Sequence, residues 1–161
     1  MESIYRKKDV KGRIAFQNSE YFKKNMVRAE WTEGDYDRQD GRTTGNTNDI
    51  YIVEVKSYTD PKHPRPYSKF IIDGEDKGYQ IDLDKLEHLV DEAEKENRIP
   101  LLYVKFEDYE VVWIPEEKTF SKRAKYVLTN KDGCNYGKKE WSWQSYLYLD
   151  EAIWRNRLNI L

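Results

Sequence analysis

The sequence lacks several features that would assign a protein to a specialised class. Cys134 is the only cysteine, so no disulfide can form within the chain. No apolar run approaches the ~18 residues of a membrane-spanning helix, and the opening segment MESIYRKKDVKGR has no apolar stretch typical of a signal peptide. We therefore expect a cytoplasmic protein with no membrane contact.

An excess of one charge is also missing. The 28 Lys and Arg residues nearly balance the 30 Asp and Glu residues, which leaves a net charge of -2. A chain with this balance does not bind nucleic acid through bulk positive charge. Any nucleic-acid site must therefore be a local cluster of cations.

Aromatic residues are abundant instead. Charged residues make up 36% of the 161 residues and the mean hydropathy is -1.00, values that alone would suggest disorder. However, 14% of the residues are aromatic, and each aromatic side chain can bury roughly 150–250 Å² in a core. The composition predicts one folded domain over residues 1–161 with a highly charged surface.

Helical and strand patterns alternate along the chain. The sequence predicts an α/β (α+β) fold in which helices flank a central mixed β-sheet. The predicted helices cover 9–25, with Asp9 as the N-cap, 82–97, with Asp82 as the N-cap, and 147–158; the predicted strands cover 27–31, 50–58, 101–106, 107–115 and 122–130; residues 59–78 are predicted to form a loop.

The strand IYIVEVKSY combines apolar and charged residues on one face. Period-two alternation places Glu54 and Lys56 on the face of Ile52, while Val53 and Val55 point the other way. Charged groups at the end of an apolar face are costly unless they pair, bind a metal or reach solvent. An ordinary ion pair and a metal-binding site are both consistent with this triplet.

A second acid close to Glu54 would favour the metal site. Asp49 lies five positions away on the same strand and therefore points to the opposite face. If the preceding turn is centred on Thr47, residues whose numbers sum to 94 pair across the hairpin, which places Asp40 opposite Glu54. A turn centred between Gly45 and Asn46 would place Asp37 there instead.

The order of these segments resembles the PD-(D/E)XK nuclease superfamily, in particular its small phage and archaeal Holliday-junction-resolvase-like members. The segments that carry the resemblance are the acid in YDRQD, the hairpin, the strand IYIVEVKS, the helix DLDKLEHLVDEAEKEN and the strand LLYVKF. The resemblance covers residues 9–114 and implies a restriction-endonuclease-like core. The proline that often precedes the first acid is missing, and residues 115–161 form an aromatic-rich C-terminal extension.

The resemblance implies a Mg²⁺- or Mn²⁺-dependent DNA endonuclease in a prokaryotic cell or a virus-infected host cell. Asp40 (or Asp37), Glu54 and the carbonyl of Val55 would bind the cation, and Lys56 would orient water or stabilise the transition state. Further positions that the resemblance suggests are Gln17 and Glu20 as metal ligands, and Gln80 and Lys85 near the catalytic site.

Local cations and aromatic residues suggest partners. We expect duplex or branched DNA to contact the basic side chains of Lys11, Arg13, Lys62, Arg65, Lys69 and Lys85, and we expect a homodimer. Aromatic residues of the extension either stack on bases or complete a core or dimer interface: Trp141, Trp143, Tyr146, Tyr148 and Trp154. The alternative function is a viral nucleic-acid-binding protein that keeps the fold without cleaving.

Overall fold

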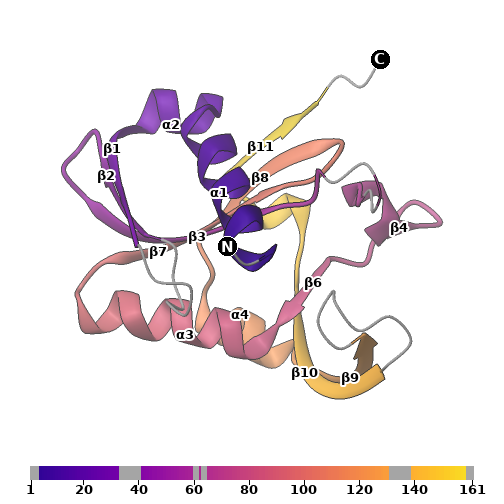
Figure 1. Cartoon of the computed structure of the whole chain (residues 1–161). Helices are drawn as coiled ribbons and strands as arrows, with labels where there is room; N and C mark the ends of the chain where they lie inside the picture. Colours follow the sequence, from indigo (N-terminus) through magenta and orange to yellow (C-terminus); the bar gives the residue numbers. More distant parts are fainter. Residues whose placement is uncertain (1–3, 33–40, 60–61, 63–64, 131–138, 159–161) are drawn as a thin grey trace.

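Six strands form the central sheet in the order β1-β2-β3-β7-β8-β11 (Figure 1). The computed structural model describes residues 4–32, 41–59, 62, 65–130 and 139–158. The strands of this sheet are β1 (Met26–Trp31), β2 (Gly41–Gly45), β3 (Ile50–Ser57), β7 (Ile99–Lys105), β8 (Tyr109–Trp113) and β11 (Trp154–Arg157). Strands β3 and β7 run parallel, and the other neighbouring pairs are antiparallel. The predicted mixed α/β architecture is confirmed.

Helices cover both faces of this sheet. The helices are α1 (Ile4–Gln17), α2 (Glu20–Asn25), α3 (Leu83–Lys95) and α4 (Glu117–Lys122). On one face Phe16 of α1 packs with Val53 and Val55 of β3, and on the other Leu86 of α3 packs with Ile52. The alternation predicted for the motif strand is confirmed, because successive residues of β3 enter two different cores.

A second sheet lies on the α3 side of the molecule. It contains β6 (Tyr79–Asp82), β10 (Lys139–Leu147) and β9 (Lys125–Asn130), with β10 in the centre (Figure 1). Its buried face continues the core beneath α3, since Tyr79, Ile81 and Leu147 belong to the same cluster as Leu86. Residues far apart in the chain are thereby brought beside the C-terminal end of β3.

The first predicted helix is interrupted. The chain forms α1 and α2 with a break at Ser19, whose Oγ accepts a hydrogen bond from the Phe22 amide at 3.1 Å and caps α2. The same hydroxyl donates to the Phe16 carbonyl at 2.6 Å. Because the helix turns at this point, the predicted apolar stripe is only partly buried, and Ile14 is 55% exposed.

The predicted C-terminal helix is wrong. Residues Leu149–Glu151 form a short 3₁₀ helix, and the chain then continues as β11, which pairs Trp154 with Val112 of β8. Alternating half-buried and exposed residues in β11 fit the edge of a sheet. The extension therefore completes the central sheet.

Part of the predicted loop at 59–78 has regular structure. Tyr67–Phe70 form a short 3₁₀ helix, followed by the hairpin β4 (Ile71–Ile72) and β5 (Glu75–Asp76). The buried Tyr67 hydroxyl donates to Asp76 at 2.8 Å and so holds the hairpin against the core.

Within the described residues, none of the helices combines the length and the apolar character needed to cross a membrane.

Candidate functional site

Glu54 and Lys56 lie half-buried on the α3 face of β3. The hairpin that precedes them has the first of the two registers considered, that of a turn centred on Thr47, because Gly41 pairs with Val53 and Arg42 pairs with Ile52, residue numbers that sum to 94. Asp40 and Asp37 lie outside the described residues. The structure thus confirms the register of the hairpin, and the choice of first acid stays a prediction.

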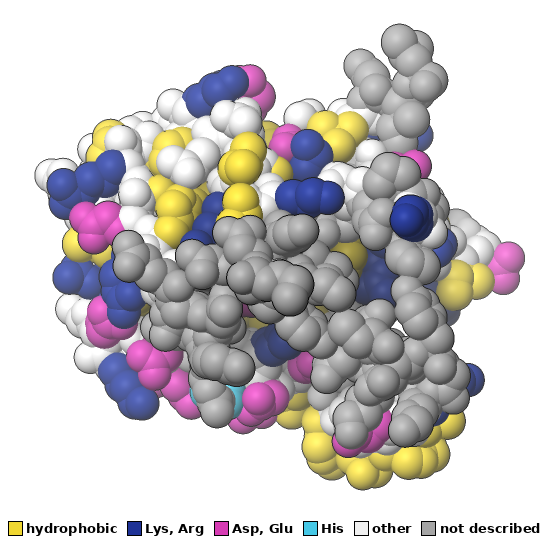
Figure 2. All heavy atoms as spheres, viewed as in Figure 1, with side chains coloured by type: hydrophobic (Ala, Val, Ile, Leu, Met, Phe, Trp, Pro, Cys, Tyr) yellow, Lys and Arg dark blue, Asp and Glu magenta, His cyan; other side chains and the backbone are white. Residues whose placement is uncertain are grey.

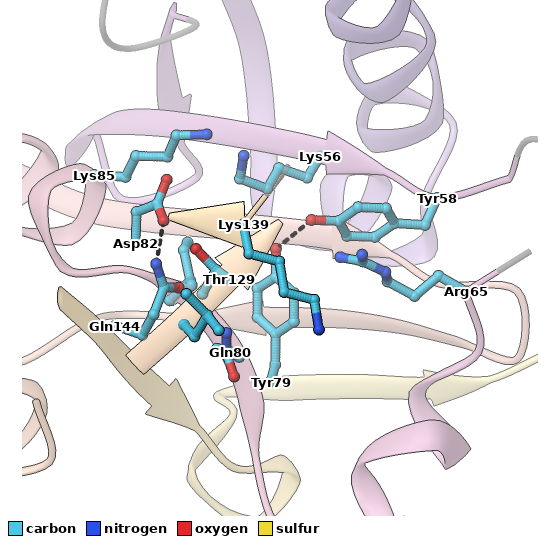
Figure 3. A pocket seen from close by; sticks show the side chains of 12 residues that line it. Lys56, Tyr58, Arg65, Tyr79, Gln80, Asp82, Lys85, Thr129, Lys139 and Gln144 are labelled. Carbon is cyan, nitrogen blue, oxygen red and sulfur yellow. Dashed lines mark hydrogen bonds between the residues drawn. The ribbon is translucent and has the colours of Figure 1, made fainter. Parts of the chain in front are cut away.

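A cavity of about 420 Å³ opens beside Lys56 (Figure 3). Residues of β3, β6, α3, β9 and β10 surround it, so it lies between the central sheet and the second sheet. Among the described residues that line it, four are cationic and one, Asp82, is acidic; the cations are Lys56, Arg65, Lys85 and Lys139. This excess of positive charge favours an anionic ligand such as a phosphate group.

Two of these cations lie side by side. The ammonium group of Lys56 lies close to that of Lys85 and lowers the pKa of Lys85, first through charge repulsion and second through reduced hydration. Asp82 and Glu54 partly offset this effect. Because Lys85 as a whole is exposed, we attribute the lowered pKa mainly to charge crowding. An anion bound between the two ammonium groups would relieve their repulsion.

Two phenols and a guanidinium form one wall of the cavity. The hydroxyls of Tyr58 and Tyr79 are 2.7 Å apart and share a hydrogen bond, and the Arg65 guanidinium carbon lies 4.6 Å from the centre of the Tyr58 ring (Figure 3). Burial, followed by the neighbouring Tyr58, raises the pKa of Tyr79 well above its ordinary value. Tyr79 therefore stays a neutral hydrogen-bonding group at physiological pH.

The opposite wall is a hydrogen-bonded network. The buried Gln144 donates through Nε2 to the Asp82 carboxylate and to Ser142 Oγ, and Ser142 Oγ lies 3.0 Å from Thr129 Oγ1. Asp82 occupies the N-cap position of α3, as predicted, but its side chain makes no capping hydrogen bond. The carboxylate instead fixes the amide of Gln144, which joins the second sheet to α3.

The structure brings several predicted residues together. Lys56, Gln80, Arg65 and Lys85 line the same cavity, and the charge of Glu54 acts on both Lys85 and Tyr79. The predictions missed other residues of its lining. Tyr58 lies two positions after Lys56, so the same period-two alternation could have predicted it. The long-range pairing of β6, β9 and β10 brings in the others, which are Tyr79, Asp82, Thr129, Lys139 and Gln144.

Gln17 and Glu20 are not near Glu54. Gln17 is exposed and accepts a hydrogen bond from Trp31 Nε1 at 2.9 Å, on the side of the sheet that α1 covers. Glu20 is exposed and lies 3.8 Å from Lys23. The strand alternation separates both side chains from the face that carries Glu54.

The remaining predicted cations also lie elsewhere. Lys11 lines a separate cavity of about 300 Å³ on the α1 side, and Arg13 donates to the Thr32 carbonyl at 2.9 Å. Lys62 and Lys69 are exposed in the segment after β3 and do not line the cavity beside Lys56. Of the predicted DNA-binding set, Arg65 and Lys85 therefore contribute to the cationic lining, and the other two lining cations, Lys56 and Lys139, come from outside that set.

Two of the three predicted oxygen ligands for a metal ion lie within the described residues. The Glu54 carboxylate and the Val55 carbonyl are the donor types that Mg²⁺ prefers. Within the described residues, no three His, Cys, Asp or Glu side chains are grouped so that they could hold a metal ion. The predicted third ligand, Asp40 or Asp37, lies outside those residues, so the metal site remains a prediction.

The chain matches no protein-family model, and no significant match was found among curated proteins or solved structures. A function must therefore be argued from the site itself.

Proposed function

We propose that this protein is a Mg²⁺- or Mn²⁺-dependent endonuclease that hydrolyses phosphodiester bonds in DNA, with a core of the PD-(D/E)XK type. The observation that carries the proposal is the position of Glu54 and Lys56. Both lie on one face of β3: Lys56 lines a cavity whose described lining carries four cations and one acid, and the charge of Glu54 acts on Lys85 and Tyr79 of that lining. A carboxylate for a cation and ammonium groups for a phosphate are thus adjacent.

The order of elements supports the proposal. The first helix, the three antiparallel strands β1–β3, the helix α3 and the parallel strand β7 follow one another as in the segments that carry the resemblance. Because β3 and β7 are parallel, their C-terminal ends lie at the same edge of the sheet, where Lys56 pairs with Val104. Ligands commonly bind at such edges of open sheets.

The proposed chemistry divides between a cation and the side chains of the cavity. A cation held by Glu54, the Val55 carbonyl and Asp40 or Asp37 would polarise the phosphate and lower the pKa of a bound water. Lys56 and Lys85 would hold the phosphate oxygens and offset the charge that develops during hydrolysis. Arg65 and Lys139 would bind neighbouring phosphates of the same DNA.

A cleavage assay tests this proposal. The wild-type protein is incubated with plasmid, linear duplex and branched DNA in Mg²⁺, Mn²⁺ or EDTA. We expect cleavage only with a divalent cation, and we expect Glu54→Gln and Lys56→Met to lose it. Glu94→Gln is the matched control, because Glu94 is an exposed acid of α3. Absence of cleavage by the wild type under all of these conditions would contradict the proposal.

A second function is favoured by the cavity alone. Its cationic lining suits an anionic ligand whether or not hydrolysis follows, so a protein that binds nucleic acid without cleaving it is the alternative. Such a protein would bind DNA equally well in EDTA and in Mg²⁺ at constant ionic strength. A nuclease with a shared cation site would bind more tightly when a cation is present.

The proposal includes a homodimer, as the resemblance implies. Light scattering of the purified chain measures the mass directly. A mass of twice 19.4 kDa is expected, and a monomer that cleaves DNA would overturn this part alone.

A further inference from the structure

The hairpin formed by β9 and β10 has two different faces. Tyr126 pairs with Trp143 and Leu128 pairs with Trp141, so these four side chains lie on one face. Thr129, Ser142 and Gln144 lie on the other face, where they form the network that borders the cavity. One strand pair thus carries an apolar face and a polar face that belongs to the candidate site.

The apolar face is open to solvent. Trp141, Trp143 and Tyr126 are 56%, 55% and 55% exposed, although they are among the largest side chains of the protein. Figure 2 shows the resulting hydrophobic patch over β9 and β10, at the lower right. An exposed patch of this kind on a folded chain is often functional.

The rings form an ordered array. The Tyr126 ring stacks on Trp141 with centres 5.6 Å apart and an interplanar angle of 19°, and it lies 5.4 Å from Trp143 at 49°. Planar faces that are already held in place lose little conformational entropy when another flat ring stacks on them. Nucleobases are flat rings and stack on aromatic side chains regardless of sequence.

Charge at one end of the array suits a polyanion. Lys139 begins β10 and alternates onto the face of Trp141 and Trp143, whereas Lys125 pairs with Gln144 and lies on the polar face. Lys139 is exposed and also lines the cavity. The acid of this hairpin within the described residues, Glu140, alternates onto the polar face. A row of bases on the rings would therefore have phosphates near Lys139, the cation that the rings share with the cavity.

The size of the patch argues against a second copy of the chain as the occupant. At about half exposure, the four apolar side chains offer roughly 400 Å². A stable protein interface buries about 800 Å² on each partner. The exposed area of the patch is large enough for a few stacked bases and is only about half of the area that each partner buries in such an interface.

We propose that the aromatic face of β9–β10 binds unpaired nucleobases of the DNA whose phosphates enter the cavity, an inference that rests on the function proposed above. A strand that passes from the cavity around the edge strand β9 meets the rings within a few nucleotides. The protein would then prefer DNA with single-stranded segments, such as flaps, gaps or open branches, over uninterrupted duplex.

Binding in EDTA tests this inference without cleavage. A short labelled oligothymidylate is compared with an abasic oligonucleotide of the same length, which has the phosphates but not the bases. We expect tighter binding of oligothymidylate by the wild type, and a loss of about tenfold or more in the Trp141→Ala/Trp143→Ala double variant. Abasic binding should not change. Ile153→Ala, at another exposed apolar residue, is the matched control.

Two further measurements keep the test independent of folding and of charge. In the wild type, oligothymidylate but not the abasic strand should quench tryptophan emission, which needs no variant. Lys85→Met should reduce the dependence of affinity on salt, whereas the double tryptophan variant should leave it unchanged.

The outcomes separate this inference from the nuclease function. Equal affinity of the wild type for the two oligonucleotides would overturn it, whether or not duplex DNA is cleaved. A dimer that becomes a monomer in the double variant, with oligothymidylate affinity unchanged, would overturn it in favour of a contact between copies. Base-dependent binding without any cleavage would support it and overturn the nuclease function.

Discussion

Lys85 illustrates how a site residue can oppose folding. Its ammonium lies beside that of Lys56, and this repulsion is the first cause of its lowered pKa. The pKa in the folded chain is therefore below the ordinary value of about 10.5 that applies when the chain is unfolded. Below the lowered pKa both states are protonated and the folded state carries the full repulsion.

Replacing this lysine should stabilise the protein. We expect Lys85→Met to raise the urea midpoint at pH 7, and we expect the gain to shrink as the pH rises from the lowered pKa towards 10.5. Lys95→Met is the matched control on the same helix, because Lys95 is exposed and lies near Glu92. A lower urea midpoint for Lys85→Met at pH 7 would show that attraction to Asp82 and Glu54 outweighs the repulsion by Lys56, and it would contradict this prediction.

The first acid can be identified by substitution. Gly41 pairs with Val53, so the register continued by one position predicts Asp40 opposite Glu54. We expect Asp40→Asn to lose Mg²⁺-dependent cleavage and Asp37→Asn to retain most of it. The measurement is the cleavage rate of each variant at equal folded fraction. The reverse pattern would assign the metal site to Asp37.

At the scale of elements, Gly41 fixes the approach of β2 to β1. A Cβ atom at this position would lie 2.4 Å from the Glu30 carbonyl oxygen and 2.7 Å from the Trp31 ring. We expect Gly41→Ala to lower the free energy of unfolding by about 1–3 kcal/mol, because the backbone carbonyl cannot move aside without disturbing the pair. Urea unfolding measures the change, and Thr44→Ala on the same strand is the control. Unchanged stability would mean that the two strands separate easily.

Local patterns predicted the elements around the motif strand. Alternation placed Glu54 and Lys56 on one face of β3, and helical spacing placed Leu86, Leu89 and Ala93 in the core. The sequence left two turn centres open, and the observed hairpin register is the one given by a turn centred on Thr47. These features depend on residues close together in the chain, so a single sequence contains them.

Long-range pairing could not be predicted in the same way. The cavity obtains Lys139 and Gln144 because β10 pairs with β6, about sixty residues earlier in the chain, and no local signal specifies that partner. The segment around Trp154 has a pattern compatible with a helix, and only the free edge of β8 makes it a strand. Fold class and the motif strand were therefore predicted, whereas most of the described lining of the cavity was not.

At the scale of the whole molecule, buried tyrosines should set the alkaline limit of stability. Burial and then the neighbouring Tyr51 raise the pKa of Tyr21 from 10.0 to about 12. The pKa of Tyr67 and of Tyr103 is also raised, in each case first by burial. Because the pKa of Tyr21 is higher in the folded than in the unfolded chain, its burial contributes fully to the free energy of unfolding below pH 10. This contribution is lost as the pH rises from 10 towards 12.

Alkaline titration tests this expectation. Tyrosinate absorbance and circular dichroism should change together above pH 10, as unfolding releases the buried phenols. Tyr21→Phe should shift the transition to higher pH, since it removes one ionisable group. Titration of all tyrosines near pH 10 with the fold intact would contradict the described burial.

The central claim is that Glu54 and Lys56 form the hydrolytic site beside the cationic cavity. The most direct measurement compares DNA cleavage by the wild type, Glu54→Gln and Glu94→Gln in Mg²⁺, with thermal unfolding of each protein as the folding control. We predict metal-dependent cleavage by the wild type and Glu94→Gln, and at least a hundredfold loss, on the order expected when a key catalytic group is removed, in a folded Glu54→Gln. Equal cleavage by all three proteins would contradict the assignment.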